Sequence, residues 1–164
     1  MQQFKEALKT LEKSKQFQDW RKKNPEAYLS YGMLVLEDKE DDWKIGYYHK
    51  KNNKVTSFTV GDKIKIEPEE DILQKEEKTV EKVDMDSVKH DLSDAITIAY
   101  ELQQEEYATE SPKKIIAVLQ TLDNAQVWNI TFLTQSYNTL NFKIKSDNLK
   151  VIEKMLSPLF QFQK

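Results

Sequence analysis

The stretch QVWNITFLTQSYNTLNFKIKSDN, Gln126–Asn148, decides how the chain folds. Two runs in it alternate apolar with polar residues, and a polar interval at 135–138 separates them. The apolar positions are Trp128, Ile130 and Phe132 in the first run and Leu140, Phe142 and Ile144 in the second. Alternation with a period of two is typical of strands that bury one face. The stretch therefore predicts an antiparallel hairpin with one apolar side.

A shorter version of this hairpin lies 85 residues earlier in the chain. Without a gap, that offset places Trp43 with Trp128, Ile45 with Ile130, Tyr47 with Phe132, Asn53 with Asn138, Val55 with Leu140, Thr59 with Ile144 and Asp62 with Asp147. Two of the three tryptophans coincide, which indicates a duplicated unit. The alternative is that any two antiparallel hairpins share such alternation, and the pairing of Ser57 with Phe142 supports it.

Both halves also share an order of elements: helix, break, then three strands. Apolar residues at helical spacing predict a first helix from Phe4, which ends at Asn24-Pro25. A second helix begins after Asp91, with Asp94 in the capping-box position. We expect an α+β fold of two αβββ repeats, each an antiparallel three-stranded meander packed by a helix.

The expected organisation divides the chain into three parts. Residues 1–66 form the first repeat, 67–90 a charged connector, and 91–164 the second repeat. The second repeat ends in a short C-terminal helix that carries Leu149, Ile152, Met155 and Leu156 and is stopped by Pro158. A half of this size is marginal alone, so we expect the halves to associate through apolar surface or sheet edges.

Composition narrows the classes of function. The net charge of −3 argues against a general nucleic-acid binder, because such proteins are usually basic. Arg21 is the one arginine among 25 basic residues, which disfavours bidentate recognition of phosphate. Cysteine is absent, and no apolar run has the length of a signal peptide or a membrane span. We expect a cytoplasmic protein with no membrane partner, although an export signal could have been removed.

The second half resembles a known module. DLSDAITIAYEL, from Asp91, resembles the first helix of the PepSY domain, a cystatin-type α+β module of some peptidase propeptides. VWNITFLTQSYNTLNFKIKSD resembles its closing hairpin, in which an aromatic strand returns to a strand that ends in Asp. This chain departs from the usual glycine after that aspartate, with Asn148 following. The resemblance implies a tandem pair of non-catalytic binding or inhibitory modules.

No constellation of residues points to catalysis. His49 and His90 are distant in sequence and lack further ligands nearby, so each is interpreted as an ordinary histidine. The acidic run at 37–42 lacks the spacing of a calcium loop and is interpreted as a solvated turn. The three glycines are isolated, which excludes a glycine-rich phosphate loop. We expect no catalytic residues, no cofactor and no metal.

Five residues are candidate contacts for a ligand or partner. Tyr48, His49 and Lys50 interleave aromatic and basic groups on one hairpin, which would suit single-stranded nucleic acid if Tyr48 were not simply part of the fold. Trp43 and Trp128 would line a small-molecule pocket between helix and sheet, or else form the core.

The leading expectation is a non-enzymatic binding or regulatory module for a protein or peptide, recruited by strand addition at an open sheet edge or as a homodimer. The alternative is a small-molecule binder or enzyme that uses a helix–sheet pocket.

Overall fold

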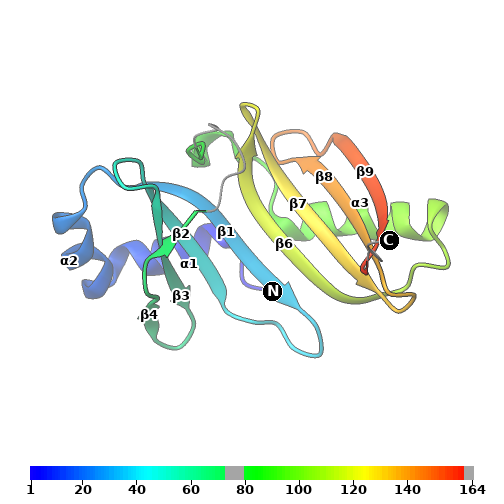
Figure 1. Ribbon diagram of the computed structural model, residues 1–164, viewed down its shortest axis with the longest axis horizontal. Coiled ribbons are helices and arrows are strands. Elements are labelled where there is room, and N and C mark those ends of the chain that lie inside the picture. The colour runs from blue at the N-terminus through cyan, green and yellow to red at the C-terminus, as the bar shows by residue number, and fades with distance from the viewer. Residues whose placement is uncertain (73–79, 161–164) are drawn as a thin grey trace.

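The computed structural model describes residues 1–72 and 80–160 (Figure 1). The helices of this part are α1 (Phe4–Lys13), α2 (Lys15–Lys23), the 3₁₀ turn η1 (Met85–Ser87) and α3 (Leu92–Glu106). The strands are β1 (Tyr28–Leu36), β2 (Trp43–His49), β3 (Lys54–Val60), β4 (Ile64–Ile66), β5 (Glu70–Asp71), β6 (Pro112–Leu122), β7 (Ala125–Thr134), β8 (Asn138–Lys145) and β9 (Val151–Pro158). The expected α+β class is confirmed.

All described strands join one antiparallel sheet. Its order is β4-β3-β2-β1-β6-β7-β8-β9, and β5 pairs with β3 beside this path. The centre of the sheet is the antiparallel pairing of β1 with β6, which runs from Tyr31↔Gln120 to Leu36↔Ile115. The expected three strands per half are too few, because the first half supplies β1–β5 and the second half supplies β6–β9. The two halves associate through sheet edges, as expected, by the hydrogen-bonded pairing of β1 with β6.

The helices lie on one face of this sheet. In Figure 1 α1 runs behind β1 to β3, and α3 runs behind the strands of the second half. Every other side chain of each central strand points toward the helices, and these rows form the core. The six apolar positions of the 126–148 hairpin are all buried, which confirms the alternation expected there. None of the described helices lies on the opposite face of the sheet, and we call it the open face.

Two tryptophans and a phenylalanine meet at the centre of the core. The Phe4 ring lies 5.0 Å from the Trp43 ring and 6.4 Å from the Trp128 ring, and the two indoles lie 6.2 Å apart, centroid to centroid. Gly32 on β1 provides the room for Phe4, because a Cβ at Gly32 would overlap the Phe4 ring carbons. Tilted and edge-on aromatic contacts of this kind stabilise a core beyond the area that they bury.

The first helical segment is divided rather than continuous. Ser14 has extended backbone angles, and its Oγ accepts a hydrogen bond from the Phe17 N–H at 3.2 Å. This side-chain cap ends α1 and begins α2. The division turns Phe17 toward Tyr47 and Phe58, with ring centroids 5.1 and 5.5 Å away.

The expected C-terminal helix is also wrong, because its residues form strand β9. Leu149 has a φ of 61°, which breaks a helix before it can start. Val151–Pro158 then pairs with β8, which would otherwise present an open edge. The apolar residues there have helical spacing, but pairing with the edge of β8 makes the segment a strand. Ile152, Met155 and Leu156 consequently remain exposed.

The described parts of the connector, 67–72 and 80–90, contain regular structure. It holds β5 at one end and η1 at the other, while 73–79 lie outside the described residues. Val83 and Val88 are buried in the core. The backbone N–H groups of Lys89 and His90 donate to the Ser146 carbonyl at 3.0 and 2.9 Å, which ties the start of α3 to the end of β8.

Replacing Gly32 by Ala should destabilise the fold by about 1–3 kcal/mol, because the new methyl group overlaps the Phe4 ring within a filled core. Urea unfolding measures this change. Gly61→Ala is the matched control, since the three atoms nearest to a Cβ there belong to the movable carboxylate of Asp42. The double variant Gly32→Ala/Phe4→Leu should cost less than the sum of its two parts. Equal costs at Gly32 and Gly61 would contradict this account.

Candidate functional site

The open face of the sheet has an apolar centre. Met33 pairs with Val118, and Val35 pairs with Ile116, across the β1–β6 junction. All four side chains are half-buried although no helix covers them. Polar residues flank this strip on β7 and β8, where the Asn141 Nδ2 group donates to Asn129 Oδ1 at 2.6 Å and to Thr131 Oγ1 at 2.9 Å. The open face thus offers a narrow apolar surface between polar borders.

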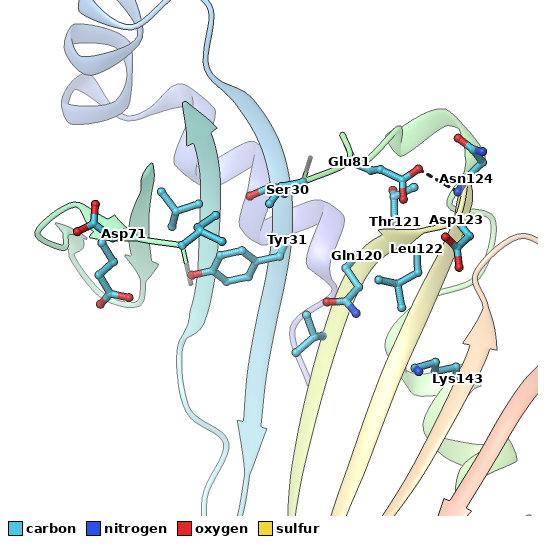
Figure 2. A pocket seen from close by; sticks show the side chains of 15 residues that line it. Ser30, Tyr31, Asp71, Glu81, Gln120, Thr121, Leu122, Asp123, Asn124 and Lys143 are labelled. Atoms are coloured by element: carbon cyan, nitrogen blue, oxygen red, sulfur yellow. Dashed lines mark hydrogen bonds between the residues drawn. The ribbon is translucent and has the colours of Figure 1, made fainter. Parts of the chain in front are cut away.

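A hollow of about 820 Å³ lies at one end of this strip (Figure 2). We call it the cup. Its floor is the cross-strand pair Tyr31 and Gln120 with the neighbouring Val118. Val55, Ile72, Val80 and Leu122 add apolar walls. This volume lies within the range of binding sites for small ligands or for several side chains, roughly 300–1,000 Å³.

Tyr31 is held in a fixed position on the floor. Its hydroxyl shares a hydrogen bond of 2.6 Å with the Ser57 Oγ. Its ring lies against Gly46, where a Cβ would overlap the ring carbons. Burial raises the pKa of Tyr31 above its ordinary value of 10.0, although the Ser57 hydrogen bond opposes the shift. The cup therefore presents a neutral phenol at neutral pH.

One wall of the cup is a crossing segment, residues 80–83, which is tied to the sheet along its length. The Tyr28 hydroxyl donates to the Val80 carbonyl, and the Val83 N–H donates to the Leu29 carbonyl at 2.8 Å. On the β6 side, the Thr121 Oγ1 donates to the Lys82 carbonyl at 2.8 Å. These bonds fix the wall to strands on both sides of the β1–β6 junction.

The same segment supports the turn between β6 and β7. Asp123 and Asn124 have φ angles of 48° and 65°, the left-handed pair found in a type I′ hairpin turn. The Asn124 N–H donates to the Glu81 Oε1 at 2.9 Å, drawn as the dashed line in Figure 2. Asp123 and Glu81 are consequently placed together at this rim of the cup.

Carboxylates occupy both rims. Glu70 and Asp71 stand on β5, and Glu81 and Asp123 stand on the crossing segment and the turn. Figure 2 shows Asp71 on one side of Tyr31, with Glu81 and Asp123 on the other side beyond Gln120. Within 1–72 and 80–160, no lysine or arginine forms an ion pair with any of the four.

One basic residue lines the cup, and it already has a partner. Lys143 on β8 forms an ion pair with Glu153 on β9. Four carboxylates and one paired lysine are the charged groups of the described lining. The described residues contain no group of three His, Cys, Asp or Glu side chains arranged to hold a metal ion.

The two tryptophans singled out in the sequence come together, but inside the core. Trp43 is 1% exposed and Trp128 is 0% exposed, so neither reaches a ligand at the surface. The alternative interpretation, that they form the core, is the one that the structure supports. Their indole N–H groups are satisfied by the carbonyls of Gln2 and His90, each at 3.0 Å.

The other three candidates stay together near the β2–β3 turn and away from the lining of the cup. Tyr48 is 3% exposed, and its hydroxyl donates to the Asn53 Oδ1 at 2.6 Å. The His49 Nε2 lies 2.8 Å from the Thr56 Oγ1. His49 and the exposed Lys50 border a smaller hollow of about 360 Å³. Tyr48 is thus a structural residue, and neither Trp43 nor Trp128 lines the smaller hollow.

Sequence reasoning missed the residues of the cup. The run of Val, Ile and Leu at 114–122 does not distinguish the open-face positions Val118 and Gln120 from the buried ones. The turn residues Asp123-Asn124 and the acidic residues at 67–71 are visible in the sequence, but nothing in it brings them together. Only the pairing of β1 with β6 shows that the cup residues of the two halves lie side by side.

Comparisons with known proteins show a similar fold but do not show a family. No protein-family model matches the chain, and no curated protein matches it. A solved structure from Clostridium difficile 630, described as a "putative lipoprotein", superposes with a TM-score of 0.55 at 14% identity. The match covers 87% of this chain and 90% of that one. At this identity the similarity concerns the fold alone. No described helix is long and apolar enough to cross a membrane.

Replacing Tyr31 by Phe should cost about 1 kcal/mol of unfolding free energy at pH 7, because Ser57, itself buried, loses its hydrogen-bond partner. Tyr137→Phe is the control, since Tyr137 is 71% exposed. Urea titration compares the two variants with the parent chain. Equal losses would show that the Ser57 hydrogen bond does not contribute.

Comparison of the parent chain with Tyr31→Phe also tests the pKa of Tyr31. A raised pKa in the folded state means that the contribution of Tyr31 is complete below pH 10 and decreases as the pH rises above it. The stability advantage of the parent chain over Tyr31→Phe should therefore shrink between pH 9 and pH 11. An advantage that grows over this interval would contradict the shift.

Proposed function

We propose that this protein is a non-enzymatic binding module that recognises a protein or peptide partner at the cup. The observation that carries the proposal is the cup itself: an apolar floor on the open face, bordered by carboxylates on both sides. Its floor and one wall are fixed by the sheet and by the hydrogen bonds of residues 80–83. A preformed apolar hollow with a few convergent polar groups is the usual form of a binding site.

Strand addition at β9 is a second route to the same class of partner. β9 ends the sheet order, so its outer edge has no strand beside it in the described part of the chain. Exposed apolar residues cluster there and just beyond, namely Ile152, Met155, Leu156, Leu159 and Phe160. Such an edge can pair with an extended peptide or with a second copy. Pro158 lacks an N–H and limits the length of that ladder.

The alternative function is binding of a small molecule, and the volume of the cup favours it. Its location differs from the one expected, because the space between helix and sheet is filled by core side chains such as Trp43 and Trp128. A ligand of this kind would enter from the open face.

We also infer that the halves are copies of one unit, as the PepSY resemblance implies. Support comes from matching registers: Trp43 pairs with Val60 as Trp128 pairs with Ile144, and Ile45 pairs with Phe58 as Ile130 pairs with Phe142. These pairs correct the gapless alignment, because the second strand of the hairpin shifts by one residue and Phe142 then corresponds to Phe58, not to Ser57.

Two further observations support the duplication. The carbonyls that accept from the two indoles belong to Gln2 and His90, each two residues before the start of a helix. Met33 and Val118, which stand 85 residues apart, are cross-strand partners of each other. This is the arrangement expected where a two-fold axis passes between two copies.

The location of the protein stays a prediction, since the description of the structural neighbour gives no support to the cytoplasm.

A randomised display library of nonapeptides tests the binding proposal. We expect a reproducible set of binders that Val118→Phe weakens by about tenfold or more, because the larger ring fills the cup. Ile66→Phe is the control, an exposed residue of β4 outside the cup and the strip, and should change affinity by less than about twofold.

Other outcomes of this experiment point elsewhere. Binders that resist Val118→Phe but are lost in Leu156→Glu would move the site to the β9 edge. The absence of any peptide sensitive to either variant would contradict peptide recognition and favour the alternative, binding of a small molecule.

The duplication predicts matched roles for the two indoles. Trp43→Phe and Trp128→Phe each remove one buried N–H donor and should each cost about 1–3 kcal/mol, with values that agree within about 1 kcal/mol. Chemical unfolding of the full chain measures both. A large cost at one site with none at the other would mean that the two positions are not equivalent.

A further inference from the structure

We infer that the protein forms a homodimer in which β9 of one copy pairs with β9 of a second copy, antiparallel and with Met155 on the two-fold axis. The inference rests on the strand addition proposed above for this edge, and it names the partner and the register. It depends on three features of β9: the direction of its free hydrogen-bonding groups, the exposed apolar residues along it, and the positions of its charges.

The register identifies the backbone groups of β9 that face away from β8. The Leu159 N–H donates to the Tyr137 carbonyl at 2.9 Å, and this bond continues the β8–β9 register past the end of the strand. In an antiparallel ladder, every second residue directs its N–H and C=O groups toward the same neighbour. Leu159 faces β8, so Leu156 and Lys154, at odd distances from it, direct these groups to the outside.

The free part of this edge is short and has a defined end on each side. Within 1–72 and 80–160, no strand pairs with the outer edge of β9. Pro158 also faces outward but has no N–H, which ends the ladder on one side. The pairing of β8 with β9 shifts at Ile152, which no residue of β8 opposes, and this bulge ends the ladder on the other side. Residues 153–157 are therefore the stretch that can accept another strand.

A second copy of β9 fits this stretch when Met155 lies opposite Met155 of the other copy. Lys154 then exchanges hydrogen bonds with Leu156 of the second copy, and Leu156 with Lys154, so that the outward N–H and C=O groups of both residues are used. The ends match as well, because Ile152 of each copy lies opposite Pro158 of the other. The two features that end the ladder thus coincide, which an unrelated strand would not reproduce.

The same register brings exposed apolar side chains together on both faces of the sheet. Met155 is 51% exposed and pairs with Asn141, which places it on the open face. Directly opposed residues that share no hydrogen bonds have Cα atoms about 4.5 Å apart, so the two Met155 side chains would be in contact. Leu156 is 43% exposed on the helix-bearing face and would lie diagonally across from Leu156 of the second copy.

The charged residues of β9 already have partners within their own chain. The Lys154 Nζ lies 2.8 Å from the Glu106 Oε2 on α3. Glu153 forms an ion pair with Lys143 on β8. Their charges are therefore balanced on either face of the sheet and do not keep a second strand away from the edge.

The charges also select the register. With Met155 on the axis, Lys154 lies opposite Leu156 of the second copy. Glu153 lies opposite Ser157 in the same register, so like charges do not meet. An axis at Lys154 or at Glu153 would set two like charges directly opposite each other. An axis at Leu156 would place each methionine opposite a serine and lose the contact between the two thioethers.

The fold already joins two edges in this way. β1 and β6 pair antiparallel, and this pairing holds the two halves together. A two-fold axis at Met155 would be perpendicular to the sheet, so the helices of both copies would lie on one side and both open faces on the other. A ladder of this length buries less surface than a standard interface, and we expect a Kd of about 1–100 μM.

Disulfide trapping tests the register, because the chain contains no cysteine. Met155→Cys would bring two thiols together across the axis, with Cα atoms at about 4.5 Å, a separation that a disulfide can span. At about 100 μM protein in a glutathione redox buffer, we expect more than about half of this variant to become a linked dimer. Ser157→Cys is the matched control on the same strand and face, because its two thiols would lie roughly 13 Å apart along the ladder.

Sedimentation equilibrium of the full chain measures the association without a cross-link. Met155→Glu would set two carboxylates opposite each other on the axis, and it should raise the Kd of the dimer by at least about tenfold. Ile66→Glu makes the same change of charge at a residue of β4 that is 48% exposed, at the other end of the sheet. This control should change the Kd by less than about twofold.

The outcomes separate the inference from the proposed function. A parent chain that stays monomeric up to about 1 mM, or equal trapping at positions 155 and 157, would overturn the homodimer and leave peptide binding at the cup as it stands. A dimer that persists in Met155→Glu would place the interface elsewhere and overturn the inference. A monomeric parent chain whose library peptides are lost in Leu156→Glu would assign the edge to a foreign peptide and overturn the second copy alone.

Discussion

The contact among Phe4, Trp43 and Trp128 over Gly32 is the interaction on which the rest of the structure depends. It joins α1 to the strands of both halves at the point where β1 meets β6. The described helices pack on the face where these large side chains gather, and the cup lies on the opposite face.

The cup also illustrates how a site can be built from places that are distant in sequence. β5, the crossing segment 80–83 and the β6–β7 turn each contribute carboxylates, and each is fixed by a different set of hydrogen bonds. The floor belongs to the central strands, which no partner needs to move. Rigid floor and independently supported rims are a combination suited to recognition, since the shape of the site is set before a ligand arrives.

Much of the fold followed from local patterns, and the site did not. The alternation at Trp128, Ile130 and Phe132 predicted a strand and its buried face, and the helices before each set of strands were also expected. β9 was misread because its apolar spacing fits a helix, and only the open edge of β8 makes it a strand. Trp43 and Trp128 were expected either to line a pocket or to form the core, and both are buried in the core. Residues of the cup could not be grouped, because nothing local to Tyr31 indicates that it pairs with Gln120.

The position of β1 in the sheet has a consequence for how the chain reaches its native state. As the chain emerges during synthesis, β1 can pair with β2 at once, but its other edge has no partner until β6 has been made. Over that interval a strand rich in Leu, Val and Tyr presents open hydrogen-bonding groups, which is the circumstance that invites aggregation. Contacts so remote in sequence form slowly. The nascent N-terminal half is therefore the part of the chain most exposed to aggregation until β6 has been made.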